Sequence, residues 1–370
     1  MYRLGCVINF AHAPFGWKNL ATHNAGVTVI IVGFSRSKNL KRLIYTESKS
    51  GESEAREVEN INSYLAPAQD VFVDGQSSPL SSIPSMNRGS APIDDGNLVF
   101  EHSEYEKFKV KNLGLNQFFH RAVGGSDFIK GNRRFVIYIS DESSLSESQM
   151  DLLLPIADKI SAFRRNSSKV ATKRLAERPL KFAEDRFYRS EMKIFIPQLQ
   201  LEGRNFIVCG IFPGDALTIA PNFDIPTCEL FPFALLSSRI HLVWIATVCG
   251  KLETRYRYSN TLGWNTFPVP TLTDRNKADL TRCAEEILLA REQYFPATIA
   301  DMYDCDRMDT EFPLVREAHD RNDEILERIY IGRRFKNDTE RLEKLFELYT
   351  KMTAQSAPKQ SNNRKPKGGK

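Results

Sequence analysis

The chain has 370 residues, of which 41% are hydrophobic and 26% are charged, a balance typical of globular proteins with two or three domains. The net charge of +5 favours an anionic partner only mildly, because dedicated nucleic-acid domains are often more basic. The longest apolar run, 27–34, is too short to cross a bilayer, and the N-terminus lacks the charged and apolar regions of a signal peptide, so we expect a cytoplasmic protein.

Residues 1–46 contain one strong strand signal. Val27–Phe34 is a continuous apolar run rich in β-branched residues, which is typical of a strand buried on both faces of a sheet. The short segment before it cannot cover such a strand, so either the rest of its sheet lies on another polypeptide or the strand packs in an unusual way. Residues 47–60 are polar and charged and predict a linker.

Residues 61–270 mix turns, short strands and helices. Residues 145–178 follow a helical period that we expect to break or bend at Pro155. An apolar helical run from Phe231 ends at Gly250 and leads into a strand that alternates arginine with tyrosine. The other short strand candidates are Asp70–Val73, Leu98–Phe100, Arg134–Ile139, Lys193–Ile196, Asn205–Phe212 and Leu217–Ala220.

The chain becomes helical from Thr271, and Thr273 or Asp274 should cap the first of three helices. Residues 353–370 are rich in serine, asparagine, proline and lysine and predict a disordered basic tail. The pattern predicts an α+β fold: a mixed α/β domain over 61–270, a small all-α C-terminal domain over 271–352, and in front of both an orphan sheet edge over 1–46.

The alternating strand is the first candidate binding site. Arg255 and Arg257 should face one way, and Tyr256 and Tyr258 the other. Paired guanidinium groups suit phosphates or guanine edges, because arginine offers a bidentate fork. The tyrosines could stack on bases or anchor the strand. A surface strand with solvated arginines and core tyrosines explains the same pattern. The candidate site continues into Ser259 and Asn260.

A second candidate is a basic stripe on the helix expected over 145–178. Arg165, Lys169 and Lys173 recur every four residues and should line one helix face. Such a face can follow a phosphate backbone without reading sequence. A solvated helix face explains the spacing equally well. The stripe is extended by Arg164, Arg174 and Arg178.

The sequence shows no recognisable catalytic apparatus. It has no glycine-rich phosphate loop, no HExxH and no serine nucleophile elbow. None of the six cysteines forms a CxxC pair or stands at zinc-ligand spacing from a histidine, and they predict buried thiols. The acidic pair Asp94-Asp95 lies in a turn context. We therefore expect no catalytic, cofactor-binding or metal site in this chain.

Several motifs stand in a recognisable order along the chain. They include Phe10-Ala11-His12, Asp95-Gly96-Asn97-Leu98, Val248-Cys249-Gly250, Tyr256-Arg257-Tyr258-Ser259, Asn265–Pro270 and Phe335–Leu342. In this order they resemble the MmeI-like Type IIL restriction–modification enzymes. These enzymes fuse a nuclease, an adenine-N6 DNA methyltransferase and a target-recognition domain.

The resemblance implies that residues 1–46 are the end of a methyltransferase domain, 61–270 a DNA target-recognition domain and 271–352 the C-terminal helical domain of the family. The (D/N/S)PP(Y/F) motif, the S-adenosylmethionine loop and the nuclease cluster of the family are absent from this sequence. We therefore expect an upstream methyltransferase/nuclease polypeptide that completes the orphan sheet and binds S-adenosylmethionine.

The implied role is to hold double-stranded DNA and read a short sequence while the catalytic part flips and methylates an adenine. Arg255 and Arg257 are the first candidate DNA contacts, followed by Arg239 and Asn260 and then by the basic stripe. We expect no methyl transfer by the chain alone. Two alternatives stay open: a truncated remnant that binds DNA without further activity, and an assembly module that only joins a protein partner through its exposed sheet edge.

Overall fold

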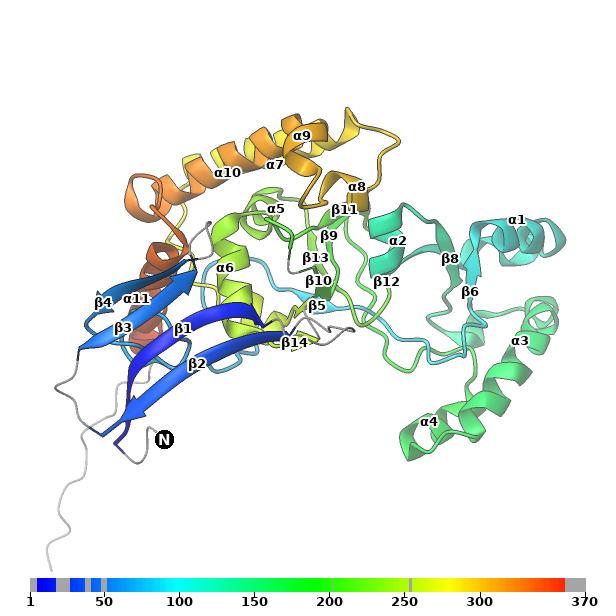
Figure 1. Ribbon diagram of the computed structural model, residues 1–370. Coiled ribbons are helices and arrows are strands. Elements are labelled where there is room, and N and C mark those ends of the chain that lie inside the picture. Colours follow the sequence, from blue (N-terminus) through cyan, green and yellow to red (C-terminus); the bar gives the residue numbers. More distant parts are fainter. Residues whose placement is uncertain are drawn as a thin grey trace, which may run out of the picture. The chain divides into compact units, whose positions relative to one another are not determined.

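The computed structural model describes residues 5–17, 27–36, 41–47, 52–201, 203–252 and 255–356. The chain forms two compact units. The smaller one contains residues 1–72, 267–270 and 339–370, and the larger one contains 73–266 and 271–338. Several small sheets precede the helices of the C-terminal region (Figure 1), which confirms the α+β prediction. In the described ranges, no helix is both long and apolar enough to cross a membrane.

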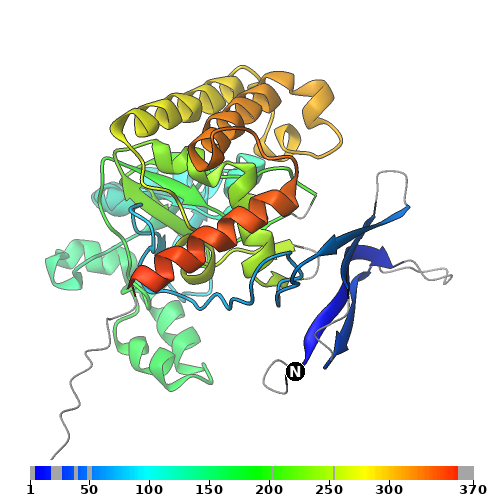
Figure 2. The same ribbon diagram turned by 90° about the vertical axis from the view of Figure 1, so that its left-hand side faces the viewer.

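The smaller unit contains a four-stranded sheet, drawn in blue in Figures 1 and 2, in the order β2-β1-β3-β4. β1 pairs antiparallel with β2 and parallel with β3, and β4 pairs antiparallel with β3. Ile8, Ala11, Ile44 and Ile61 form its apolar core. The strands are β1 (Val7–Trp17), β2 (Val27–Ser35), β3 (Arg42–Glu47) and β4 (Ser53–Val58).

Two expectations about this unit are wrong. The apolar strand β2 is an edge strand of the sheet and is not buried on both faces: Ile30 and Ile31 are 53% and 49% exposed. The expected linker 47–60 contains β4, whose polar side chains are mostly exposed because the strand closes the opposite edge of the sheet. Polar composition therefore indicated solvent exposure there and not the absence of a strand.

The centre of the larger unit is the sheet β11-β9-β13-β5, in which all neighbours are antiparallel. Ile194 and Ile225 pair across β9 and β13, Phe195 points to the opposite face, and none of the three has exposed surface, so this sheet is packed on both faces. The strands are β5 (Asn87–Arg88), β9 (Met192–Ile196), β11 (Gly210–Pro213) and β13 (Phe223–Thr227).

A second sheet of the larger unit, β12-β7-β8-β6, forms a lobe that lies at the right of Figure 1. Leu153 and Ile160 of α3 pack with Val136 and Ile137 of β8 in the core of the lobe. Its strands are β6 (Val99–Glu101), β7 (Phe119–Val123), β8 (Arg134–Ile137) and β12 (Leu217–Thr218). Its helices are α1 (His102–Lys111), η2 (Leu113–Phe118), α2 (Gly125–Lys130), η3 (Glu142–Ser144), α3 (Glu147–Arg165), α4 (Val170–Arg174) and η4 (Leu175–Glu177).

The helical prediction for this lobe needs one correction. The helix runs through Pro155 without a break and ends instead at Arg165. The chain then turns, and the separate short helix α4 begins at Val170, with Lys169 as its N-cap residue. Ser167 lies in this turn, where its hydroxyl accepts a hydrogen bond from the Lys169 backbone N–H, a local contact that competes with a continuous helix.

In the third sheet of the larger unit, β10-β15-β14, the strands β14 and β15 follow a pair of apolar helices, whereas β10 comes before them in the chain. Helix α6 is buried nearly all round, which explains its nearly continuous apolar sequence. The elements are β10 (Leu199–Gln200), α5 (Phe231–Leu236), α6 (Arg239–Val248), β14 (Lys251–Leu252), β15 (Arg255–Arg257) and the π-helix η5 (Asn260–Trp264).

The C-terminal region is helical, as predicted. The side chain of Thr273 caps α7 by accepting a hydrogen bond from the Asn276 backbone N–H. Helix α11 extends to Ser356, so the first residues of the expected tail are helical, while 357–370 lie outside the described residues. The helices are α7 (Asp274–Glu292), α8 (Ile299–Met302), α9 (Met308–Glu311), α10 (Pro313–Ile331) and α11 (Asp338–Ser356).

Candidate nucleic-acid interface

Strand β15 is held on both sides. It pairs with β10 through Leu199↔Arg257 and with β14 through Leu252↔Arg255. The Arg257 backbone N–H also donates to the Gly250 carbonyl at 2.8 Å. The arginine–tyrosine segment is therefore a fixed strand and not a free loop, as its alternation indicated.

The tyrosine at the end of this strand anchors it to the core. Tyr258 is 1% exposed, and its hydroxyl is 2.9 Å from His241 Nε2 on helix α6. Burial lowers the pKa of His241 to about 3, so the ring is neutral near pH 7. Arg257, one residue earlier, is exposed, as the alternation of side chains along a strand requires.

The next two residues mainly organise the backbone. The Ser259 hydroxyl accepts from the Leu262 backbone N–H and so caps the π-helix. The Asn260 amide donates to the Met86 carbonyl at 3.1 Å and joins this segment to the residues just before β5. Both side chains position the surface that Arg257 reaches.

A pocket of about 340 Å³ opens beside this segment. Its lining combines two arginines with small, polar and aromatic residues and contains no carboxylate. The lining residues are Arg88, Gln198, Phe223, Gly250, Arg257, Tyr258, Ser259 and Asn260. No sequence pattern indicated Arg88, which stands in a turn-rich segment without periodicity.

Arg239 is placed differently from the other candidates. It is the first residue of α6, and its guanidinium donates to both carboxylate oxygens of Asp338, at 3.2 and 2.6 Å. Its backbone N–H donates to the Asp323 carboxylate at 2.7 Å. These contacts support a structural role for Arg239 at the start of the helix that leads to β15.

The expected basic stripe does not form one helix face. Arg165 ends α3, Lys169 precedes α4 and Lys173 lies in α4, although all three are exposed. Arg164, expected to extend the stripe, has no exposed surface. The exposed residues remain a candidate for backbone contact, but without the regular spacing that a single helix would give them.

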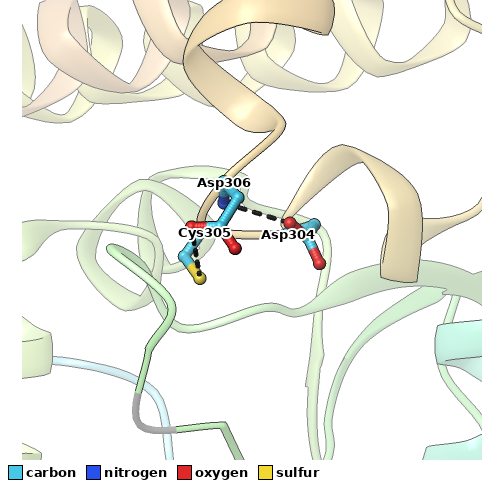
Figure 3. Close-up of side chains that lie close together, drawn as sticks. All are labelled: Asp304, Cys305 and Asp306. Carbon is cyan, nitrogen blue, oxygen red and sulfur yellow. Dashed lines mark hydrogen bonds between the residues drawn. The ribbon is translucent and has the colours of Figure 1, made fainter.

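Asp304, Cys305 and Asp306, between α8 and α9, bring three ligand-type atoms within 4.8 Å of one another (Figure 3). The Asp306 backbone N–H donates to the Asp304 carboxylate at 3.0 Å, a turn contact that explains the cluster. Desolvation and the neighbouring carboxylates of Asp306 and Asp304 raise the pKa of the Cys305 thiol. A metal-binding thiolate is therefore disfavoured, and we assign no metal site to this group.

Three family models match successive parts of the chain. Residues 1–46 match "MmeI, DNA-methyltransferase domain", 67–271 match "MmeI, target recognition domain" and 272–357 match "MmeI, C-terminal domain". The pocket and β15 lie within the second match. The chain thus contains an MmeI-type target-recognition region, with residues of a methyltransferase domain before it and a C-terminal helical domain after it.

The chain belongs to the MmeI family. It is 33% identical over 356 residues to "DNA methyltransferase A" of Bacillus subtilis (strain 168), covering 95% of this chain and 39% of that protein. It is also similar to the solved structure of the Type IIL restriction–modification enzyme MmeI in complex with DNA, with a TM-score of 0.82 and 33% identity. That match covers 95% of this chain and 47% of the MmeI chain, so the chain spans less than half of either relative.

Proposed function

We propose that this chain is the DNA target-recognition part of a site-specific adenine-N6 DNA methyltransferase in a restriction–modification system. One observation carries the proposal: the segment matching the target-recognition model presents a fixed strand whose exposed Arg257 borders a pocket without carboxylates. Such a surface suits a polyanion, because guanidinium groups bind phosphates and guanine edges. The similarity to MmeI, solved in complex with DNA, supports the same ligand class.

The candidate residues divide into two roles under this proposal. Arg255 and Arg257 contact double-stranded DNA, with Tyr256 beside them on the same strand. Tyr258, Ser259 and Asn260 hold the strand and the pocket in place, as their burial and hydrogen bonds indicate. The exposed cations Arg165, Lys169 and Lys173 add contacts to the DNA backbone, while Arg239 fixes α6.

Methyl transfer requires S-adenosylmethionine, and the residues present do not fit its binding. In the part of 1–46 that the structure describes, Gly33 lies inside β2, where the Phe10 ring already fills the space beside it: an added Cβ would be 2.2 Å from that ring. No glycine-rich sequence occurs in this segment. We therefore propose that a methyltransferase polypeptide binds the cofactor and supplies the chemistry, and that this chain alone transfers no methyl group.

The exposed edge of the β2-β1-β3-β4 sheet supports a docking site for that methyltransferase polypeptide. β2 is at the edge of the sheet and carries Ile30, Ile31 and Phe34, which are 53%, 49% and 43% exposed. Exposed apolar edge strands tend to pair with another chain. The match of residues 1–46 to a methyltransferase domain supports the choice of partner.

Fluorescence anisotropy with labelled duplexes tests the proposal. Preference for one sequence in a randomised duplex pool, with affinity that falls steeply with salt, supports target recognition. Salt-sensitive binding without sequence preference favours a remnant. Absence of DNA binding together with stable association with a family methyltransferase domain favours an assembly module. Transfer of a radiolabelled methyl group from S-adenosylmethionine to DNA by the purified chain alone would contradict our assignment of chemistry to a partner.

A further inference from the structure

The pocket beside β15 contains an arginine that the sequence did not indicate. The backbone around Arg88 is fixed by three contacts. Arg88 pairs with Phe223 of β13, the Gly89 N–H donates to the Asn222 carbonyl at 2.8 Å, and the Asn260 amide binds the Met86 carbonyl. The position of this side chain is therefore set by the central sheet and not by a mobile loop.

The close approach at Gly89 adds to this constraint. A Cβ on Gly89 would lie 2.5 Å from the Thr218 carbonyl oxygen, a distance that real Cβ atoms essentially never show. Glycine is thus required for the chain after Arg88 to pack against residues 218–220. Arg88, the residue before this close approach, lines the pocket.

Among the described residues, neither Arg88 nor Arg257 has a side-chain hydrogen bond or an ion pair. Both guanidinium groups border one pocket whose lining offers no carboxylate. Glu184 lies within electrostatic reach of Arg88, but Arg186 already pairs with Glu184 at 2.5 Å. Two like charges at one pocket repel each other unless an anion lies between them. The two arginines without side-chain partners therefore point to an anionic ligand.

The shape of the site favours a backbone phosphate over a base. Phosphates project from the outside of a duplex and can enter a concave pocket, whereas base edges lie at the bottom of the grooves and need projecting side chains. A flipped base would need an exposed ring for stacking. Phe223 and Tyr258 are only 3% and 1% exposed and offer little ring surface.

We propose that Arg88 of β5 and Arg257 of β15 together hold one phosphate group of the DNA backbone in this pocket. The proposal rests on the proposed function, because it names a contact of the same DNA-binding surface. The phosphate fixes the register of the recognition domain on the duplex without itself reading a base. Sequence specificity then comes from neighbouring side chains that face a groove of the DNA duplex.

The test compares Arg88→Ala with Arg275→Ala in the full-length chain. Arg275 is a matched control because its side chain is 91% exposed on α7 and R275A removes the same charge away from the pocket. Affinity for several duplexes of different sequence is measured by fluorescence anisotropy at about 50 and about 200 mM salt. Far-UV circular dichroism establishes that each variant is folded, and Arg88→Lys serves as a second variant that keeps the charge without the fork.

The R88A variant should bind every duplex more weakly by the same factor. Raising the salt from about 50 to about 200 mM weakens binding of the unaltered chain by some factor. For R88A that factor should be about 3.5-fold smaller, the change expected for one lost phosphate contact. R275A should keep the salt dependence of the unaltered chain, and R88K should retain most of it.

Two results would overturn the phosphate assignment. One is an R88A variant with the affinity and salt dependence of R275A. The other is an R88A variant whose loss of affinity depends on duplex sequence, which would indicate a base contact. In both cases the unaltered chain still binds DNA. Failure of the unaltered chain to bind any duplex would instead refute the proposed function.

Discussion

Arg164 allows a sharp test of the lobe built on β6, β7 and β8. It has no exposed surface, although its neighbour Arg165 on the same helix is exposed. Its guanidinium donates five hydrogen bonds of 2.8 to 3.0 Å to backbone carbonyls. The acceptors are Pro92, Ile93, Leu175, Arg178 and Lys181.

Arg164 therefore ties two separate chain segments, around residues 92–93 and 175–181, to the end of α3. Hydrogen bonds to a charged group contribute about 1.5–3 kcal/mol each. Some of the stranded carbonyls would regain water in a truncation variant, so the sum is an overestimate. We expect Arg164→Ala to lower the free energy of unfolding by about 3–5 kcal/mol, the scale found when one member of a buried charged network is removed. Arg164→Lys should recover little, because an ammonium group cannot supply five donors.

Arg165→Ala is the matched control, because Arg165 is the next residue, carries the same charge and is exposed. We expect this variant to change the free energy of unfolding by no more than about 0.5 kcal/mol. Urea unfolding gives the difference in stability, and hydrogen exchange locates it. The amides of Ile93 and Asp94, and those of 175–178 and 180–182, should exchange faster in R164A than in R165A. Equal unfolding midpoints and equal exchange in the two variants would refute the role given to Arg164.

Three further predictions concern the larger unit. Burial lowers the pKa of His241 from 6.5 to about 3, so its contribution to stability is complete above about pH 6.5 and is lost as the pH falls; between pH 7 and pH 5 the loss is about 2 kcal/mol. His241→Gln should remove that part of the pH dependence of the urea midpoint, and an unchanged dependence would contradict it. Tyr303→Phe should reduce stability by about 1–3 kcal/mol because it strands two buried hydrogen-bond partners, while Tyr294→Phe, at an exposed backbone contact, should have a smaller effect in the same thermal unfolding assay. Gly89→Ala should reduce stability by about 1–3 kcal/mol, because the new Cβ clashes with a backbone carbonyl. Gly114→Ala is the control and should be near neutral, because a Cβ there has nothing within 4 Å. Equal melting temperatures for G89A and G114A would argue against the close approach at Gly89.

Local patterns predicted those parts of the fold in which side-chain burial follows a simple period. Lys193–Ile196 is almost all of β9, and the arginine–tyrosine alternation marks β15. Asp70–Val73 has strand-like composition but is not in a strand. β-Propensity states only that a segment suits a sheet, and pairing needs a partner strand that local sequence does not identify.

The sequence could predict those site residues whose role depends on one local segment. It could not predict residues whose role depends on segments that are distant in the chain and meet only in the fold. Arg257 could be found from its strand. Arg88 could not, because its importance comes from pairing with Phe223, 135 positions later in the chain. Arg164 was misinterpreted although a signal existed: it follows the buried Ala157 and Ile160 at helical spacing, which places it on the inward face of α3.

Residues 73–266 and 271–338, which come from the target-recognition match and the C-terminal match, form one compact unit, and this affects how β15 is held. A buried chain of hydrogen bonds crosses that boundary: Arg291 of α7 donates to the Tyr303 hydroxyl, Tyr303 donates to His319 Nε2, and His319 Nδ1 donates to the Ser237 carbonyl. Burial lowers the pKa of His319 well below 6.5, so the neutral ring can accept one hydrogen bond and donate the other.

The acceptor at the end of this series of hydrogen bonds is Ser237, which lies between α5 and α6, and the C-terminal end of α6 leads into β14 and β15. Asp323 of α10 accepts a hydrogen bond from the first backbone N–H of α6, and Asn322 donates to the Ala234 carbonyl at the end of α5. The C-terminal helices thus fix the helix that positions Arg257. Under the proposed function, recognition requires side chains held to within a fraction of an ångström, so substitutions in this buried network should weaken DNA binding, measured by fluorescence anisotropy, without any contact to DNA.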